Sequence, residues 1–316
     1  MRSFGNTMNR DLPSALAWRF GVCELARPVL RGLPAGRVRI AGWLGAGQNS
    51  AGWEQHPHPI KVFRDHRIGA WVQADLRDWG GRWHYFAGIY YDQTLSWIMR
   101  QCLKPGDRFV DVGANYGMHT LTASRLVGEK GRVFAVEPSP AALRRLKLHL
   151  ELNAVTNVVV AESAVGASAG EARLSVDSTH LGTATLRDHS GFGDAVIVPV
   201  GRLDDVVPVP AGGPFALVKI DVEGLELNVV KGAAGWLARH NTVFVVEVTP
   251  DWIRGLGEDP GELMTLFANA GFRGFAIERN RRYGAKPRLT PVTTLEGAQA
   301  DYLFVRESEM RQFNWI

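Results

Sequence analysis

The stretch GDRFVDVGANYGMHT, residues 106–120, decides the fold of this chain. It opens with the short apolar run RFVDVG, of the kind that forms a strand buried on both faces. Gly113 and Gly117 then mark a tight turn, and the residues after Tyr116 have helical spacing. Glycines at such a turn let the backbone approach a ligand closely. The stretch therefore predicts the start of an α/β sheet with a ligand at the turn.

Strand and helix patterns alternate after this stretch. Further strands are predicted by apolar runs bounded by turn residues: RVFAVEP, NVVVAESAV, PFALVKIDVEG and TVFVVEVTP. FRGFAI and DYLFVR come last and have no helix between them, so we expect an antiparallel pair. The alternation predicts a doubly wound, Rossmann-like α/β sheet that is mostly parallel, with an antiparallel last strand.

Two parts of the chain depart from this alternation. EARLSV and AVIVPV are separated by a polar segment, residues 177–194, which predicts an inserted hairpin or a long loop. Residues 1–90 mix short apolar runs with Gly- and Pro-rich pieces. We therefore expect an irregular N-terminal extension or substrate-cap region over residues 1–90 and the ligand-binding domain over residues 91–316.

Composition and charge restrict the class of protein. The chain has 316 residues, of which 46% are hydrophobic, and a net charge of +4, too small an excess to indicate nucleic-acid binding. Cys23 and Cys102 have no metal-type spacing. No apolar window is long enough for a membrane span, and the first residues lack the apolar core of a signal peptide. We expect a cytoplasmic protein with a small-molecule or saccharide substrate, no nucleic-acid or membrane partner, and the capacity to form a homo-oligomer.

The acid at the end of the second predicted strand narrows the ligand. Glu137 lies where a carboxylate can accept hydrogen bonds from two ribose hydroxyls. It also comes 20 residues after Gly117, a spacing that nicotinamide sites share. The glycines discriminate, because dinucleotide sites use G-x-G-x-x-G, whereas Gly113 and Gly117 have no third glycine in register. S-adenosylmethionine is favoured over NAD, and a turn without any ligand is the remaining alternative.

From about Gly88 to Val305 the chain resembles the FkbM family of S-adenosylmethionine-dependent methyltransferases, which have the class I Rossmann-like fold. The pieces that carry the resemblance are, in order, GIYYD, GDRFVDVGANYGMHTL, GRVFAVEPSPAALRRLKLHLELN, VVVAESAVG, RLDDV, LVKIDVEGLELNVVKGA and VFVVEV. Asp92, the last residue of GIYYD, stands where the family usually has Glu. The resemblance implies methyl transfer, most often to a hydroxyl oxygen of a sugar, a polyketide or another secondary metabolite.

The resemblance also implies which residues bind the cofactor. They are Asp111, Gly113, Asn115 and Gly117 beside the methionine part, Glu137 at the ribose, and Glu162 and Ser163 beside the adenine. Asp221, at the end of the fourth predicted strand, would face the methionine amine and the reacting methyl group.

An alcohol that accepts a methyl group must also lose its proton, which a carboxylate or a histidine can take. The candidates at the expected carboxyl edge of the sheet are Asp221, Glu223 and Glu247, with His180 in the polar segment. Glu223 has the alternative role of a helix N-terminal acid, and Glu247 that of an ion-pair partner. Asp221 and Glu223 also suit Mg²⁺, but no third ligand is evident, so we expect no metal.

Two other functions stay open at this point. Transfer to the nitrogen of a small-molecule amine would need less help from a base, and the sequence does not separate it from transfer to oxygen. An S-adenosylmethionine-binding interaction module without catalysis is the second alternative, although intact Asp111, Glu137 and Asp221 argue against it.

Overall fold

The structure, a computed structural model, describes residues 11–33, 36–47, 50–88, 90, 92–176, 184–185, 195–210, 213–280, 285–295 and 297–315. The chain divides into two units, Met1–Tyr91 and Asp92–Ile316. Among the described residues, no helix combines the length and the apolar character that crossing a bilayer requires.

The first unit contains more regular structure than the sequence predicts. Its elements are α1 (Asp11–Gly32), α2 (Arg37–Ala41), η1 (Gly42–Ala46), η2 (Trp53–Gln55), β1 (Ile60–Asp65), β2 (Ala70–Asp75), α3 (Trp79–Arg82) and η3 (Trp83–Ala87). Helix α1 has 22 residues and includes Pro28. Proline is unfavourable inside a helix, so the sequence does not indicate a continuous helix here. Strands β1 and β2 pair antiparallel. Aromatic side chains of η3 are buried inside this unit, where the rings of Trp53 and Phe86 are 5.6 Å apart.

A sheet of eight strands forms the centre of the described part of the second unit. Its order is β13-β12-β14-β11-β10-β3-β4-β5. The strands are β3 (Arg108–Val112), β4 (Arg132–Val136), β5 (Val158–Ala161), β10 (Ala216–Ile220), β11 (Thr242–Val248), β12 (Phe272–Glu278), β13 (Arg288–Val292) and β14 (Ala300–Arg306). Strands β5, β4, β3, β10 and β11 are parallel, and β14 runs antiparallel to β11 and β12. The predicted doubly wound α/β fold is confirmed.

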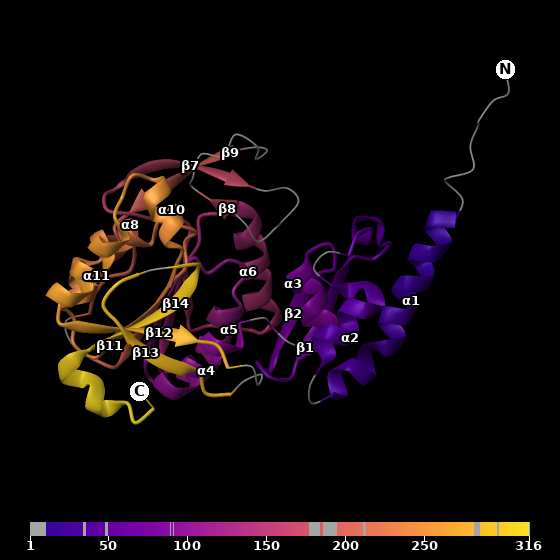
Figure 1. The fold of residues 1–316 in the computed structure, drawn as a ribbon, viewed down its shortest axis with the longest axis horizontal. Helices are drawn as coiled ribbons and strands as arrows, with labels where there is room; N and C mark the ends of the chain where they lie inside the picture. Colours follow the sequence, from indigo (N-terminus) through magenta and orange to yellow (C-terminus); the bar gives the residue numbers. More distant parts are fainter. Residues whose placement is uncertain are drawn as a thin grey trace, which may run out of the picture. The chain divides into compact units, whose positions relative to one another are not determined.

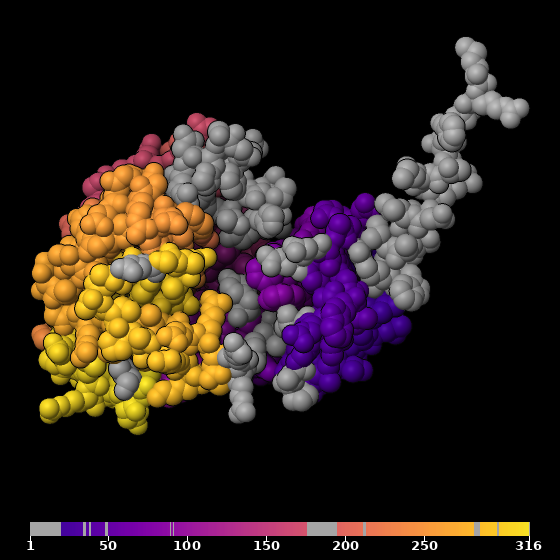
Figure 2. Space-filling model, in the orientation of Figure 1, coloured from indigo at the N-terminus to yellow at the C-terminus, as the bar shows by residue number. Residues whose placement is uncertain are grey.

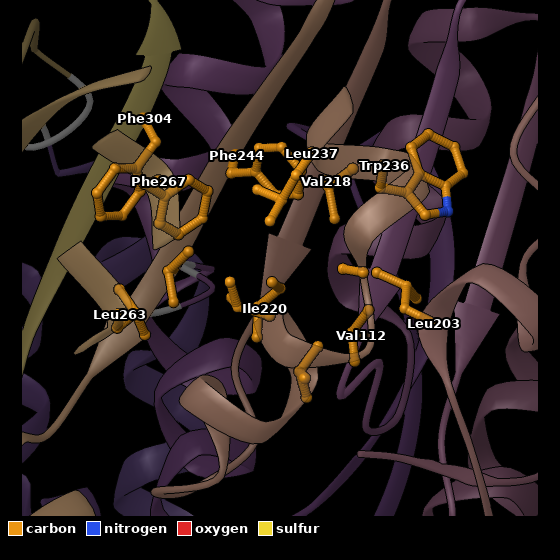
Figure 3. Packing of buried hydrophobic residues seen from close by; sticks show 14 of the residues in the cluster. Val112, Leu203, Val218, Ile220, Trp236, Leu237, Phe244, Leu263, Phe267 and Phe304 are labelled. Carbon is orange, nitrogen blue, oxygen red and sulfur yellow. The ribbon is translucent and has the colours of Figure 1, made fainter. Parts of the chain in front are cut away.

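Helices cover both faces of this sheet (Figure 1). One face carries α4 (Gln93–Cys102), α5 (Met118–Val127) and α6 (Pro140–Leu152). The opposite face carries α8 (Glu226–Lys231), α9 (Ala234–Ala238) and α11 (Pro260–Asn269), and Figure 3 shows the apolar cluster beneath them. In this cluster the rings of Phe267 and Phe304 stack 3.8 Å apart. Strand order reverses between β3 and β10, which is where α/β sheets bind ligands.

The strands of the second unit differ from the prediction in two ways. NVVVAESAV is not one strand, because the chain leaves the main sheet after Ala161. It enters a second sheet formed by β6 (Ala164–Val165), β7 (Gly170–Val176), β8 (Ala184–Thr185) and β9 (Ala195–Gly201). The inserted hairpin is therefore part of a four-stranded sheet in the described residues. Strand β13, which the sequence analysis missed, lies between β12 and β14 in the chain and pairs with β12.

The remaining elements lie at the surface of the second unit. They are α7 (Leu203–Val206), α10 (Pro250–Gly255) and η4 (Glu307–Gln312). Figure 2 shows the C-terminal residues of this unit, in yellow, adjoining the orange residues that precede them in the chain.

Candidate functional site

The loops that follow β3 and β10 pack backbone against backbone. Gly113 has φ +76°, and a Cβ atom there would lie 1.9 Å from the carbonyl oxygen of Asp221. Gly117 has φ +85°, and its Cβ would lie 2.3 Å from Cδ1 of Leu146 on α6. The backbone of Asp221 thus requires glycine at position 113, whereas at position 117 glycine is favoured by the positive φ. The sequence analysis gave a different reason for them, the close approach of a ligand.

Lys219, the last residue but one of β10, connects these two loops by contacts from the interior. Its Nζ donates to the carbonyl oxygen of Gly113 at 2.8 Å and lies 3.2 Å from Asp111 Oδ1 and 3.3 Å from Asp221 Oδ2. Asp111 is fully buried and accepts a 2.6 Å hydrogen bond from the hydroxyl of Thr120. Burial lowers the pKa of Lys219, but the two carboxylates outweigh it and hold that pKa above its ordinary value. Asp111 and Lys219 form the buried support of the site.

Glu137, directly after β4, faces the loop that follows β3. Its Oε2 accepts from the backbone N–H of Asn115 at 2.7 Å and its Oε1 from that of Ser139 at 2.8 Å. Asn115 has φ 50°, a left-handed conformation that turns its N–H toward the carboxylate. Burial raises the pKa of Glu137 to about 7, although the two N–H groups lower it. Each oxygen keeps a lone pair for a further donor.

The two residues after β5 have different surroundings. Glu162 is half exposed and forms a 2.6 Å ion pair with Lys147 on α6. The hydroxyl oxygen of Ser163 is buried and has no hydrogen-bond partner among the described residues. A buried hydroxyl normally has a partner, so this atom is a candidate ligand contact.

The turn after β10 starts its helix later than the sequence predicts. Glu223 has φ 56° and Gly224 φ 100°, and α8 begins only at Glu226. Glu226 is the acid at the helix N-terminus, and its Oε1 accepts from the N–H of Gly224 at 2.7 Å. Burial raises the pKa of Glu226 to about 7. Gly224 therefore belongs to the turn, and the role of N-terminal acid suggested for Glu223 belongs to Glu226.

Two carboxyl groups lie opposite each other on β11 and β14. Glu247 and Asp301 are partners in the antiparallel register, so their side chains leave the same face of the sheet. Glu247 accepts a hydrogen bond from the amide of Gln299, and Asp301 lies 3.4 Å from the guanidinium of Arg279. Burial, with Asp221 and Asp301 nearby, raises the pKa of Glu247 to about 9. Burial and Asp92 raise that of Asp301 to about 6.

Asp92 and His119 form a second pair of ionisable side chains at the carboxyl edge of the sheet, near Asp301. Asp92 caps α4 by accepting from the N–H of Leu95 at 3.1 Å, and its other oxygen lies 3.2 Å from Nε2 of His119. His119 is in the first turn of α5 and is nearly buried. Burial raises the pKa of Asp92, but the bond to His119 outweighs it and lowers the pKa below its usual range. The pair ties the starts of α4 and α5 together.

One predicted catalytic residue, His180, lies outside the described residues. The described part of the chain contains no group of three His, Cys, Asp or Glu side chains arranged to hold a metal.

Sequence reasoning missed Lys219 and Asp301 at the carboxyl edge of the sheet, whereas it placed Arg279, in the basic stretch 278–288, on this side. Lys219 had a signal, because it is a charged residue in a strand whose five residues are all buried. Asp301 had none, because its place is set by the antiparallel pairing of β14 with β11.

Comparison with known proteins gives consistent results. Residues 111–273 match the family model of the methyltransferase FkbM domain. The hexuronic acid methyltransferase AglP of Haloferax volcanii is 31% identical over 199 residues, which cover 60% of this chain and 73% of that protein. Methyltransferase sdnD of Sordaria araneosa is 30% identical over 216 residues, covering 58% and 79%. A crystal structure of a methyltransferase FkbM from Methylobacillus flagellatus aligns with a TM-score of 0.40 at 13% identity, over 84% of this chain and 60% of that one.

Proposed function

Since the chain belongs to the FkbM family of S-adenosylmethionine-dependent methyltransferases, we propose that it methylates a hydroxyl oxygen of a sugar or another secondary metabolite. The observation that carries the proposal is the row of carboxyl groups, Asp221, Glu247 and Asp301, at the same sheet edge as Glu137. Carboxylates accept hydrogen bonds from hydroxyls and can take their protons.

The described residues fit S-adenosylmethionine. Glu137 offers two buried carboxylate oxygens, each with a lone pair left, to the ribose hydroxyls. Ser163 has a buried hydroxyl without a partner among the described residues, on the side proposed for adenine, with Glu162 next to it. The loop Gly113–Gly117, which includes Asn115, is proposed for the methionine part, and Asp221 is three-tenths exposed beside it. Asp111 supports this loop through Lys219.

When bound, S-adenosylmethionine supplies an electrophilic methyl group on a positively charged sulfur. The residues of the chain have to align the acceptor oxygen with that methyl group, exclude water and remove the acceptor's proton. Asp221 is proposed to hold the methionine amine and to border the reacting methyl group. The proton acceptor is sought among Asp221, Glu247 and Asp301, with His180 as a candidate outside the described residues.

Transfer to an amine nitrogen is the second candidate. The observation that favours it is the excess of carboxyl groups at the edge, where Asp92, Asp221 and Asp301 outnumber Arg279 and Lys219 even with Glu247 neutral. Such an excess suits a cationic acceptor as well as a hydroxylated one.

A labelled methyl donor separates these possibilities. The purified protein is incubated with S-adenosylmethionine that carries a deuterated methyl group and with a panel of neutral sugars, hexuronic acids, polyketide alcohols and amino sugars. Mass spectrometry detects the product, and NMR assigns the methyl group to oxygen or nitrogen. The proposal expects label on a hydroxyl oxygen, and no label with Asp221→Asn. Label on nitrogen alone would overturn O-methylation, and so would the absence of product with every hydroxylated acceptor.

A further inference from the structure

On the face of the main sheet that α4 and α5 cover, four neighbouring strands carry apolar side chains along most of their length. At the carboxyl edge of the parallel strands each series ends in an ionisable side chain. Side chains on a strand alternate between its two faces, so every second residue lies on this one. The apolar members pack in one cluster with α4 and α5. The series are Leu217, Lys219 and Asp221 at β10; Val243, Val245 and Glu247 on β11; Val305, Leu303 and Asp301 on β14; and Phe275, Ile277 and Arg279 at β12. The ionisable ends form one row across four strands.

Glu247 and Asp301 stand side by side in this row. Like charges on directly opposite residues of an antiparallel pair repel, so the two carboxyl groups cannot both be ionised without a counter-charge. In the described part of the chain, Asp301 has a counter-charge within ion-pair distance, the guanidinium of Arg279 at 3.4 Å, whereas Arg279 acts on Glu247 only from farther away. The Coulomb interactions of Glu247 with Asp221 and Glu223 disfavour its ionised form, and Lys219 offsets them only in part.

The contact with Gln299 fixes where a proton on Glu247 would lie. The Gln299 amide donates to Oε1 of Glu247, so a neutral Glu247 would carry its proton on Oε2. Asp301 instead receives the positive charge of Arg279 and retains a side-chain exposure of 11%. Asp92, the other acid near Asp301, is bonded to His119. Two carboxyl groups whose surroundings drive their proton affinities apart are the usual arrangement of an acid and a base in one site.

We propose that Glu247 and Asp301 work as an acid–base pair in which Asp301 takes the proton of the acceptor hydroxyl and neutral Glu247 donates a hydrogen bond. The proposal rests on the proposed O-methylation and assigns its base to a residue that sequence reasoning did not consider. It also changes the role of Glu247 from base to donor. The pKa values of about 9 for Glu247 and about 6 for Asp301 have the order that this division requires.

The methyl transfer balances in atoms and charge with S-adenosylmethionine as donor and Asp301 as proton acceptor. The acceptor oxygen forms its bond to the methyl carbon while the carbon–sulfur bond breaks and its electron pair stays on sulfur. The acceptor's O–H bond breaks, and its proton passes to the carboxylate of Asp301. The positive charge of the donor is thereby cancelled, and Asp301 returns its proton to water after product release.

A titration of the free protein tests the pair without any acceptor. Side-chain carboxyl groups labelled with ¹³C are followed by NMR from pH 4 to pH 10, and Glu247→Gln and Asp301→Asn assign the two signals. We expect Glu247 to be neutral and Asp301 ionised at pH 7. In Asp301→Asn the midpoint of Glu247 should fall by about one pH unit or more, because a neighbouring negative charge is lost. An ionised Glu247 at pH 7 in the unmodified protein would overturn the pair.

Two further variants keep the titration decisive. Arg279→Gln removes the counter-charge and should raise the midpoint of Asp301, even if Asp301→Asn folds poorly. Asp251→Asn removes an exposed carboxylate of α10 that pairs with Arg254 and should leave both midpoints unchanged. An unchanged Asp301 midpoint in Arg279→Gln contradicts the proposal.

Turnover with an acceptor found in the panel tests the catalytic half. We expect Asp301→Asn to lower kcat by about 100-fold, a typical loss for a general base, while S-adenosylhomocysteine affinity stays within about threefold. The rate of the unmodified enzyme should rise near pH 6 and fall near pH 9, and Glu247→Gln should lose the alkaline limb. Full activity of Asp301→Asn overturns the assignment. If no hydroxylated acceptor turns over, the proposed function fails, whereas the titration still decides the protonation of the pair.

Discussion

The carbonyl oxygen of Asp221 lies 1.9 Å from the position that a Cβ atom on Gly113 would take. The ends of β3 and β10, the two strands at the reversal of the sheet order, are therefore in backbone contact. Lys219 reinforces the contact from β10 by donating to the carbonyl oxygen of Gly113 at 2.8 Å. The loop proposed for the methionine part of the cofactor and the residue proposed for its amine are thus held in direct contact.

Gly113→Ala should destabilise the protein and weaken cofactor binding together. The new methyl group meets the backbone of Asp221, which cannot move without the end of β10. We expect a loss of at least about 2 kcal/mol in the free energy of unfolding, measured by denaturant titration. Gly106→Ala is the matched control, because Gly106 has φ +95° but no atom within 4 Å of the added Cβ. It should lose only about 1 kcal/mol, from backbone strain alone. Equal losses in the two variants would show that the contact with Asp221 does not matter.

Lys219→Met should leave a buried negative charge without its partner. Asp111 is fully buried and lies 3.2 Å from the Lys219 ammonium. Breaking a buried pair costs about 3–5 kcal/mol, and the double variant with Asp111→Asn should recover part of it. Lys231→Met is the control, because Lys231 pairs with Glu258 and Glu262 near the surface, and it should cost about 1 kcal/mol or less. A small effect of Lys219→Met on thermal unfolding would contradict the buried network.

Glu137→Ala should weaken S-adenosylhomocysteine binding by about 1–3 kcal/mol, the value of lost charge-assisted hydrogen bonds to the ribose. Calorimetry measures it, and circular dichroism checks that the variant is folded. Unchanged affinity in a folded variant removes Glu137 from the site.

The affinity of the unmodified protein should also depend on pH. The pKa of Glu137 is raised to about 7, and ribose hydroxyls prefer the ionised carboxylate. Binding below pH 7 must therefore release a proton, so affinity should increase between pH 6 and pH 8 and then level off. This increase should be absent in Glu137→Gln.

Glu247→Gln should change how stability depends on pH. A carboxyl group whose pKa is higher in the folded than in the unfolded state contributes stability below its unfolded pKa and loses it as pH rises. For Glu247 the window runs from its unfolded pKa near 4.5 to about 9. The variant does not lose stability in this way. Its free energy of unfolding, relative to that of the unmodified protein, should therefore rise by about 1–3 kcal/mol across the window in denaturant titrations. A constant difference from pH 5 to pH 9 would mean that Glu247 titrates alike in both states.

Asp221→Asn should impair turnover more than stability. Asp221 is partly exposed, and its ion pair with Lys219 is shared with Asp111. We expect a loss of kcat of about 100-fold or more and a change in unfolding free energy of about 1 kcal/mol. Full activity of the folded variant would remove Asp221 from the mechanism.

The local patterns of the sequence were sufficient for the main fold. Buried runs such as that before Gly113, and the cap formed by Ser139 and Pro140 at α6, depend on neighbours in the chain. Strand β13 and the second sheet did not follow from such patterns. Whether a short strand such as β6 joins the main sheet depends on partners far away in the chain, here β9.

Some residues of the candidate site can also be predicted from local sequence, whereas others depend on the pairing of distant strands. Glu137 and Asp221 are recognisable because each follows directly after a predicted buried strand. Asp301 comes to the same edge only through the antiparallel register of β14 with β11. The requirement for glycine at position 113 also depends on tertiary structure. The atom that leaves no room for a Cβ there is the carbonyl oxygen of Asp221, in the loop after β10.

The most direct measurement is a calorimetric titration of the purified protein with S-adenosylhomocysteine, with NAD in parallel and EDTA as a control for metal. A methyltransferase that holds its cofactor between Glu137 and Asp221 should bind S-adenosylhomocysteine with a Kd of about 1–100 μM, unaffected by EDTA, and should not bind NAD. Binding of NAD instead, or no binding of S-adenosylhomocysteine to the folded protein, would contradict this assignment.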